Sequence, residues 1–180
     1  AFSALGIINA TGTWDSPYIP EYPGAALFEG EHLHTRDFKD ADYFKGKHII
    51  IVGAGISAIQ LLDQISQVTS TTWVTRRPPE FRKVPFDERA GSRAVALVEE
   101  RVRKGLLPQS VVSVTGLPFT PEIEAMQNRG VLTRFPMFSE ITRNGVKWED
   151  GRETNADVIF WNTGFKWPLS HLDPVLPREE

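Results

Sequence analysis

The chain alternates short apolar runs with longer stretches whose apolar residues recur at helical spacing, and this pattern predicts strands and helices in turn. The apolar run KHIIIV carries the strongest strand signal of the chain. Buried strands are predicted in four places: 6–10, 47–52, 71–75 and 157–161. Because helical segments lie between the later strands, the expected fold class is α/β, with a Rossmann-like parallel sheet flanked by helices.

Three helices are predicted from spacing and from capping residues. Apolar residues at helical spacing indicate a helix over 56–67. A second helix is expected over 88–104, because basic side chains fill its last turn and Gly105 follows it. Thr120 and the proline after it are typical of an N-cap and a first helical position, so a short acidic helix follows and ends near Gly130.

Turn residues predict how the remaining segments connect. The segment 14–24 contains three prolines, which fix φ and remove N–H donors, so it is expected to be an extended connector. The pair Asp150-Gly151 predicts a tight hairpin between 145–148 and 152–155.

Composition narrows the class of protein. The 180 residues are 41% apolar and 24% charged, which is typical of a folded chain. The net charge of −3 gives no general attraction to nucleic acid or to anionic membranes. There is no cysteine, which excludes thiol catalysis, disulfides and Cys-ligated metals, and no apolar run reaches the roughly 20 residues of a membrane span. We therefore expect a cytoplasmic protein without nucleic-acid or membrane partners.

The main chemical signal is the loop GAGISA, which follows the strand 47–52 directly and opens the first predicted helix. Gly53 permits a tight turn, Gly55 lets the backbone approach a pyrophosphate, and Ala58 keeps the helix close to the sheet. The helix N-terminus then presents N–H groups to the phosphates. The predicted cofactor-binding residues of this loop are Gly53, Ala54, Gly55, Ile56, Ser57 and Ala58.

The end of the second strand indicates which dinucleotide binds. An NAD site usually carries Asp or Glu about 20 residues beyond the first glycine, where it bonds the ribose 2′-hydroxyl. This chain instead has Thr75, Arg76 and Arg77 there. Two guanidinium groups match the geometry of a 2′-phosphate, so NADPH is the expected cofactor.

Three further signatures follow one another along the chain: Ala10-Thr11-Gly12 with the proline-rich link after it, the segment 28–38 (FEGEHLHTRDF), and Thr163-Gly164-Phe165. In the same order they resemble the ATG segment, the fingerprint F-x-G-x-x-x-H-x-x-x-(Y/W) and the second ATG-type turn of flavin-containing monooxygenases, the FAD- and NADPH-dependent class B flavoprotein monooxygenases. Phe38 stands in the last position of the fingerprint. Since Phe38 replaces Tyr or Trp, the Baeyer–Villiger, N-hydroxylating and bacterial subclasses remain open.

The resemblance implies a division of the chain. Residues 1–45 would be the end of an FAD-domain strand and a proline-rich linker, 46–165 the NADPH-binding domain, and 166–180 a return segment towards the FAD domain. The family's FAD-binding G-x-G-x-x-G does not occur in these residues, so we expect the chain to be a fragment of a longer flavoenzyme. Its partner would be the FAD-binding portion of the same polypeptide.

The resemblance also implies roles for individual residues. His34 would sit at an exposed hinge or linker that orients NADP⁺ beside the flavin. Thr11, Gly12, Thr163 and Gly164 would lie between the two domains, against FAD or the nicotinamide. NADPH would reduce FAD, and molecular oxygen would then supply one atom to a small soft-nucleophile or carbonyl substrate.

No side chain is expected to act as a catalytic group or metal ligand. The sequence offers no nucleophile–base pair, and the cofactors carry the difficult steps in such enzymes. His32 and His34 have the spacing of a metal pair but no third ligand is evident near them, while the strand residue Trp73 is expected in the core. Two other functions remain open: a flavin-dependent disulfide-type reductase whose cysteines lie elsewhere, and a non-enzymatic dinucleotide-sensing module.

Overall fold

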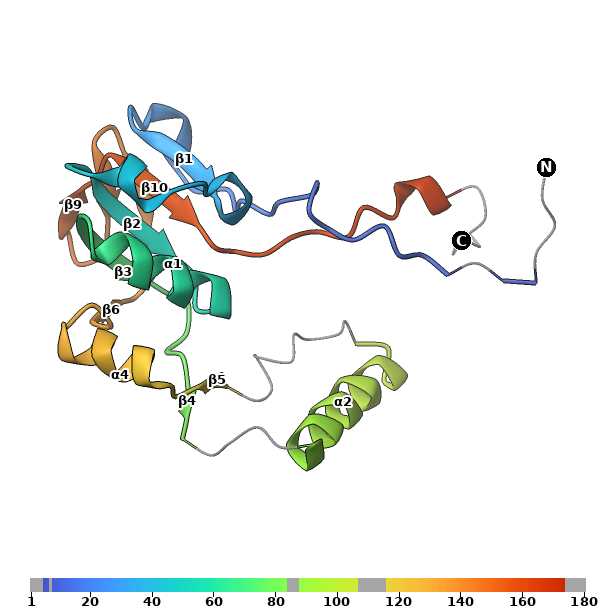
Figure 1. Ribbon diagram of the computed structural model, residues 1–180. Coiled ribbons are helices and arrows are strands. Elements are labelled where there is room, and N and C mark those ends of the chain that lie inside the picture. Colours follow the sequence, from blue (N-terminus) through green and yellow to red (C-terminus); the bar gives the residue numbers. More distant parts are fainter. Residues whose placement is uncertain (1–4, 7, 84–87, 107–115, 174–180) are drawn as a thin grey trace.

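The centre of the protein is a five-stranded, fully parallel sheet with the strand order β1-β10-β2-β3-β6 (Figure 1). The structure is a computed structural model that describes residues 5–6, 8–83, 88–106 and 116–173. The strands are β1 (Glu31–His34), β2 (His48–Val52), β3 (Ser70–Val74), β6 (Arg134–Phe135) and β10 (Val158–Trp161). The predicted α/β fold with a parallel sheet is confirmed, and three of its strands are those expected from the apolar runs.

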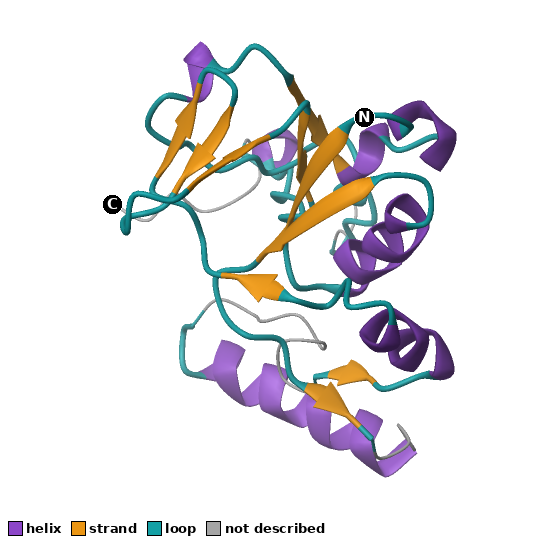
Figure 2. Cartoon of the chain, turned by 90° about the vertical axis from the view of Figure 1, so that its left-hand side faces the viewer, coloured by secondary structure: helices purple, strands orange, loops and turns teal. Residues whose placement is uncertain are grey.

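The sheet is the middle layer of three. Successive side chains of a strand point to opposite faces, so Ile49 and Ile51 of β2 pack in one core cluster while Ile50 and Val52 pack in another. Figure 2 shows helices on one side of the central strands and a small antiparallel sheet on the other. Burial on both faces explains why β10 and most of β2 are continuous apolar runs rather than alternating ones.

Helices cover the first face as the sequence predicts. Helix α1 (Ile56–Ser66) packs on β2 and β3, and the 3₁₀ turn η3 (Ala41–Phe44) adds the buried ring of Phe44 to the same cluster. Helix α4 (Pro121–Asn128) begins where expected, because the Thr120 hydroxyl accepts a hydrogen bond from the backbone N–H three residues on. Both helices confirm the predictions made from spacing and capping.

The second face is covered by the antiparallel sheet β7-β8-β9. Its strands are β7 (Glu140–Thr142), β8 (Gly145–Lys147) and β9 (Glu153–Asn155). The predicted hairpin is β8–β9, and its turn contains Gly151 with a φ of 84°. Val146 of β8 is fully buried against the central sheet, so this small sheet takes the place of a second helical layer.

Helix α2 (Glu88–Arg103) stands apart from the sheet in both ribbon views (Figures 1 and 2). The chain reaches it and returns through two short parallel strands, β4 (Phe81–Arg82) and β5 (Leu117–Pro118). The helix was expected from the sequence, and Ala94 is its buried residue.

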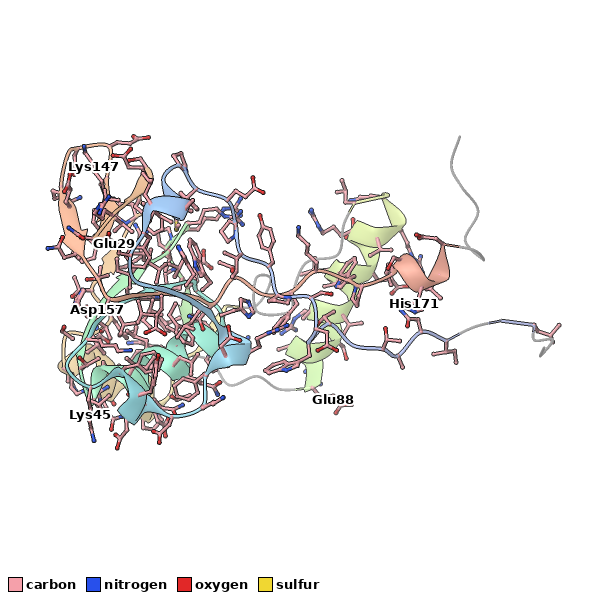
Figure 3. All side chains as sticks on the ribbon, turned by 90° about the horizontal axis from the view of Figure 1, so that it is seen from above. Glu29, Lys45, Glu88, Lys147, Asp157 and His171 are labelled. Atoms are coloured by element: carbon pink, nitrogen blue, oxygen red, sulfur yellow. The ribbon has the colours of Figure 1, made fainter. Side chains whose placement is uncertain are left out.

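Two extended segments leave the sheet on the same side and run antiparallel to each other (Figures 1 and 3). We call residues 8–22 the N-terminal arm and residues 162–173 the C-terminal arm. Pro17 and Phe165 form an isolated antiparallel bridge between them, and the proline-rich stretch 14–24 contains no helix or strand, as its sequence predicts. The 3₁₀ turn η1 (Ala25–Leu27) follows the first arm, and η4 (Ser170–Leu172) lies on the second.

The strand predicted over 6–10 is wrong for the residues that the structure describes. Leu5 and Ile8 lie outside any strand and are exposed, Ile8 by 96%, while Ile7 falls outside the described residues. A β-branched apolar run becomes a strand only where a neighbouring strand supplies hydrogen-bond partners, and none lies beside these described residues.

Strand β1 was not expected, and it falls inside the stretch 1–45, for which the family resemblance implies a strand end and a linker. It pairs in parallel with β10 over four residues, so this stretch contributes an edge strand to the central sheet. Within the described residues, no helix combines the length and the apolar character needed to cross a bilayer.

Candidate nucleotide-binding site

A cleft of about 640 Å³ opens at the carboxyl edge of the sheet, above the ends of β2, β3 and β10. This is the edge at which parallel α/β sheets bind ligands, next to a strand where the direction of chain progression reverses. Its volume is in the range of small-molecule sites. The residues around it that bear on function are Tyr18, Tyr22, Gly53, Ala54, Gly55, Arg76, Arg77, Glu80, Asn162 and Thr163.

The glycine loop has the conformation that its sequence predicts. Gly53 has a φ of 137°, and a Cβ there would stand 2.4 Å from the Asn162 carbonyl oxygen, so no other residue fits without displacing the backbone. Gly55 is the N-cap of α1, and no atom lies within 4 Å of the position its Cβ would take. No side chain caps the first turn of α1, so its N–H groups remain available to an anion.

Strand β3 holds the loop in place through two hydrogen bonds. The Gly53 N–H donates to the Val74 carbonyl at 2.9 Å, and the Trp73 indole N–H donates to the Gly53 carbonyl at 2.8 Å. The second bond directs that carbonyl dipole towards β3. Trp73 is buried as predicted, but its role in fixing the loop was missed, since nothing in the local sequence links the two positions.

The two arginines that follow β3 reach the same cleft. Arg76 and Arg77 are both exposed, and within the described part of the chain neither forms an ion pair. Burial raises the pKa of the neighbouring Tyr22 phenol, and the positive charge of Arg76 opposes that rise. Glu80 is the carboxylate on this rim, three residues beyond Arg77. The cleft therefore combines a glycine loop with two cations free to meet an anion.

Thr75 was predicted to bind the cofactor, but its side chain points inward. The residue is fully buried, and its hydroxyl donates to the Arg77 carbonyl at 2.8 Å. Arg134, at the start of β6, donates from Nη1 to the Thr75 carbonyl at 3.0 Å. Arg134 was missed because it lies 59 residues along the chain and precedes no recognisable motif.

His34 is 1% exposed, so the expectation that its side chain is exposed is wrong. Its Nδ1 accepts from the Arg36 N–H at 3.4 Å, at the start of the 3₁₀ turn η2 (Thr35–Asp37), which leaves the proton on Nε2. Nε2 then donates to the Gly164 carbonyl at 2.9 Å. Burial lowers the pKa of His34, which keeps the ring neutral and able to make both bonds. The histidine thus joins the end of β1 to the C-terminal arm.

The structure brings only part of the ATG-type residues to the cleft. Thr163 lines it, its hydroxyl donates to the Tyr18 carbonyl, and Gly164 follows with a φ of 80°. Thr11 and Gly12 lie out on the N-terminal arm, where the Thr11 hydroxyl donates to Asn9 at 3.0 Å. These two residues are therefore not part of the cleft around the glycine loop.

His32 and His34 have separate partners. The His32 Nδ1 accepts from the Trp161 indole N–H at 3.1 Å, and its Nε2 lies 3.2 Å from the Ala25 carbonyl oxygen. Within the described residues, no three His, Cys, Asp or Glu side chains gather as a metal site would require.

Comparison with known proteins finds flavin monooxygenases. The family profile described as "Flavin-binding monooxygenase-like" matches residues 2–83. The chain is similar to dimethylaniline monooxygenase [N-oxide-forming] 2 of Macaca mulatta, with 26% identity over an alignment 204 residues long. The alignment covers 97% of this chain and 38% of that protein. This chain thus spans well under half the length of that relative.

Solved structures show the same likeness. The chain superimposes on a flavin-containing monooxygenase from Stenotrophomonas maltophilia with a TM-score of 0.71 and 33% identity, covering 90% of this chain and 43% of that one. It shares the fold of cyclohexanone monooxygenase from Rhodococcus sp. Phi1 bound to NADP⁺, with a TM-score of 0.54 and 16% identity, covering 83% and 44% of the two chains. Taken together, the family profile, the relatives and the solved structures show that the chain is similar to flavin monooxygenases.

Proposed function

We propose that this chain binds NADPH as the pyridine-nucleotide-binding part of an FAD-dependent monooxygenase. The observation that carries the proposal is that the glycine loop lies on one cleft with Arg76 and Arg77, which form no ion pair with any described residue. The monooxygenase names of the relatives support this function over a disulfide-type reductase or a sensing module.

The cleft fits the pyrophosphate of a dinucleotide. The open space beside Gly55 lets the backbone approach phosphate oxygens, and the uncapped first turn of α1 offers N–H donors and the positive end of the helix dipole. Ala58 is fully buried, so the helix packs tightly against the sheet behind this site. The backbone of 53–58 would therefore hold the pyrophosphate, and no carboxylate among these residues opposes it.

The arginine turn fits a 2′-phosphate rather than a ribose hydroxyl. An NAD site would carry a carboxylate where Arg76 stands, and a guanidinium fork bonds phosphate oxygens in pairs. The structure of cyclohexanone monooxygenase bound to NADP⁺ has the same fold as this chain, which supports the choice.

The flavin would be held jointly with the rest of the polypeptide. Thr163 and Gly164 at the edge of the cleft, and Thr11 and Gly12 on the N-terminal arm, would face FAD or the nicotinamide. The dinucleotide supplies a hydride and the flavin supplies the oxygen chemistry, so the residues of this chain need only bind, orient and exclude water. The oxygen acceptor would be a small soft-nucleophile or carbonyl compound.

Calorimetric titration of the 180-residue chain with NADP⁺ and NAD⁺ tests the proposal. A charge-assisted hydrogen bond is worth about 1.5–3 kcal/mol, and partial exposure of the arginines reduces this. We therefore expect NADP⁺ to bind roughly 10- to 100-fold more tightly. Arg76→Ala should remove most of the preference and leave the affinity for NAD⁺ nearly unchanged, because both dinucleotides share the glycine-loop contacts.

The matched control is Arg143→Ala, which removes an arginine paired with Glu29 on the surface at the amino edge of the sheet. This control should keep the full preference. The preference should also shrink as salt is added, because the interaction with phosphate is screened. Equal affinities of the unaltered chain for the two dinucleotides would overturn the assignment of NADPH.

A further inference from the structure

The turn that carries Arg76 and Arg77 is held by hydrogen bonds from two residues, Thr75 and Arg134, that do not line the cleft. Thr75 is fully buried at the end of β3, and Arg134 is half-buried at the start of β6. Arg134 Nη1 donates to the Thr75 carbonyl at 3.0 Å and approaches the Thr75 hydroxyl oxygen at 3.3 Å. That hydroxyl in turn donates to the Arg77 carbonyl at 2.8 Å.

These bonds fix the peptide units on both sides of the arginine pair. The Thr75 carbonyl belongs to the peptide that enters Arg76, and the Arg77 carbonyl belongs to the peptide that leaves Arg77. Pro78 follows and restricts Arg77 to extended backbone conformations. The Thr75 N–H also donates to the Phe135 carbonyl at 3.1 Å, which ties the base of the turn to β6. Among these hydrogen bonds, none involves the peptide group between Arg76 and Arg77.

We infer that Thr75 and Arg134 are positioning residues that set the preference for a 2′-phosphorylated dinucleotide without touching it. This inference rests on the proposed function. A flexible arginine loses conformational freedom when it binds a phosphate. If the turn already has its binding conformation before the ligand arrives, less freedom is lost. Arg134 acts through Thr75, because its Nη1 is directed at main-chain and hydroxyl oxygens and it lies outside the cleft lining.

Thr75→Val is the decisive variant, because valine keeps the shape and removes the hydroxyl without changing any charge. A neutral hydrogen bond contributes about 0.5–1.5 kcal/mol, so we expect the NADP⁺ preference to fall roughly two- to tenfold. The affinity for NAD⁺ should stay the same. Because both arginines remain, NADP⁺ binding should keep its dependence on salt, whereas Arg76→Ala should lose much of it. Thr75→Ser restores the hydroxyl and should restore the preference.

Thr72→Val is the matched control. Thr72 lies in the middle of β3, is also buried, and bonds His48 Nε2 at 2.9 Å, away from the arginine turn. This variant loses an equivalent hydroxyl and should keep the full preference for NADP⁺. Thermal unfolding of both variants shows whether each is folded at the titration temperature.

Arg134→Met extends the test and should lower the preference as Thr75→Val does, with salt dependence retained. A loss of salt dependence like that of Arg76→Ala would identify Arg134 as a direct phosphate ligand and overturn its positioning role. If Arg134→Met does not fold, the pair Thr75→Val and Thr75→Ser decides the matter. An unchanged preference in Thr75→Val overturns the inference alone, whereas equal affinities in the unaltered chain overturn the proposed function as well.

Discussion

At the scale of single residues, the structure gives Trp73 a second task besides filling the core. Its indole N–H holds the carbonyl of Gly53, and the pyrophosphate would approach the N–H groups that follow. If this bond is lost, the Gly53 peptide is free to rotate, and its carbonyl oxygen would turn part of its negative charge towards the phosphates.

We predict that Trp73→Phe weakens NADP⁺ and NAD⁺ binding equally, by roughly two- to tenfold for one hydrogen bond. The ratio of the two affinities should not change, since the arginine turn is untouched. Trp148→Phe is the matched control, because that indole also donates to a backbone carbonyl at 2.8 Å, but to Pro136 under the small sheet. Calorimetry on both variants decides the prediction, and equal behaviour of the two would contradict it.

At the scale of elements, two histidines, the buried His34 and the half-buried His48, tie strands to their neighbours. His34 ends β1, and His48 begins β2, where its ring nitrogens lie 2.7 Å from the Ser70 hydroxyl and 2.9 Å from the Thr72 hydroxyl. Burial lowers the pKa of both rings below the ordinary value of 6.5, although the nearby carboxylate of Asp157 opposes this at His48. The folded chain therefore binds these two protons more weakly than the unfolded chain does.

This difference makes stability depend on pH. Above the unfolded value of 6.5 both states are neutral at these rings, and stability is full. As pH falls through the folded pKa values, the unfolded chain takes up protons first, so the free energy of unfolding decreases. We predict a lower Tm at pH 5.5 than at pH 7.5, and a smaller drop in His48→Gln. Differential scanning calorimetry measures both, with His171→Gln on exposed η4 as the control; an equal drop in all three proteins would refute the assignment.

The elements also show what the sequence could predict. Burial on both faces makes β10 and most of β2 apolar, and β3 is rich in β-branched residues, so the positions of these strands followed from the sequence pattern. Strand β1 was not predicted because two of its four residues are histidines. Their rings form hydrogen bonds with backbone and indole partners that are distant in sequence. Residues 6–10 carry a strand-like sequence without a strand beside them in the described structure.

The site divides in the same way. The glycine loop is one contiguous run of residues and the arginine pair is another. The sequence alone therefore indicates the chemistry expected of each. The contacts of Arg134, Trp73 and Asn162 join segments that are 20 to 109 residues apart, and only the sheet order brings these together. A positioning residue has no signature of its own, because its identity depends on what the fold places beside it.

At the scale of the whole molecule, the described residues form one cleft around the glycine loop and a pair of exposed arms. Its sequence contains a single G-x-G loop, which the proposal assigns to NADPH. Thr11 and Gly12, which the family resemblance places against flavin, are exposed on the N-terminal arm. Trp14 and Trp167 on the two arms are 60% and 55% exposed, far more than a packed tryptophan.

We predict that the purified 180-residue chain binds NADP⁺ but retains no FAD, because the ADP half of FAD needs its own helix N-terminus. The preparation should be colourless, and the absorbance near the flavin band should stay at baseline after gel filtration with added FAD. The NADP⁺ titration on the same preparation confirms that the chain is folded. Flavin retained at close to one per chain would show that the glycine loop is wrongly assigned.

The antiparallel course of the two arms has a mechanical consequence. Because both arms leave the sheet at one edge, tension applied to the two ends would load their cross-links one after another rather than all together. The Lys166–Ser16 bond lies outermost and would break first, followed by the Tyr18–Gly164 bond. His34 holds the same Gly164 carbonyl from the sheet side, so opening would stop there until β10 itself is pulled from its neighbours. Weak forces would therefore separate the two arms while the sheet stays intact. His34 lies at the boundary between the part that opens easily and the part that resists.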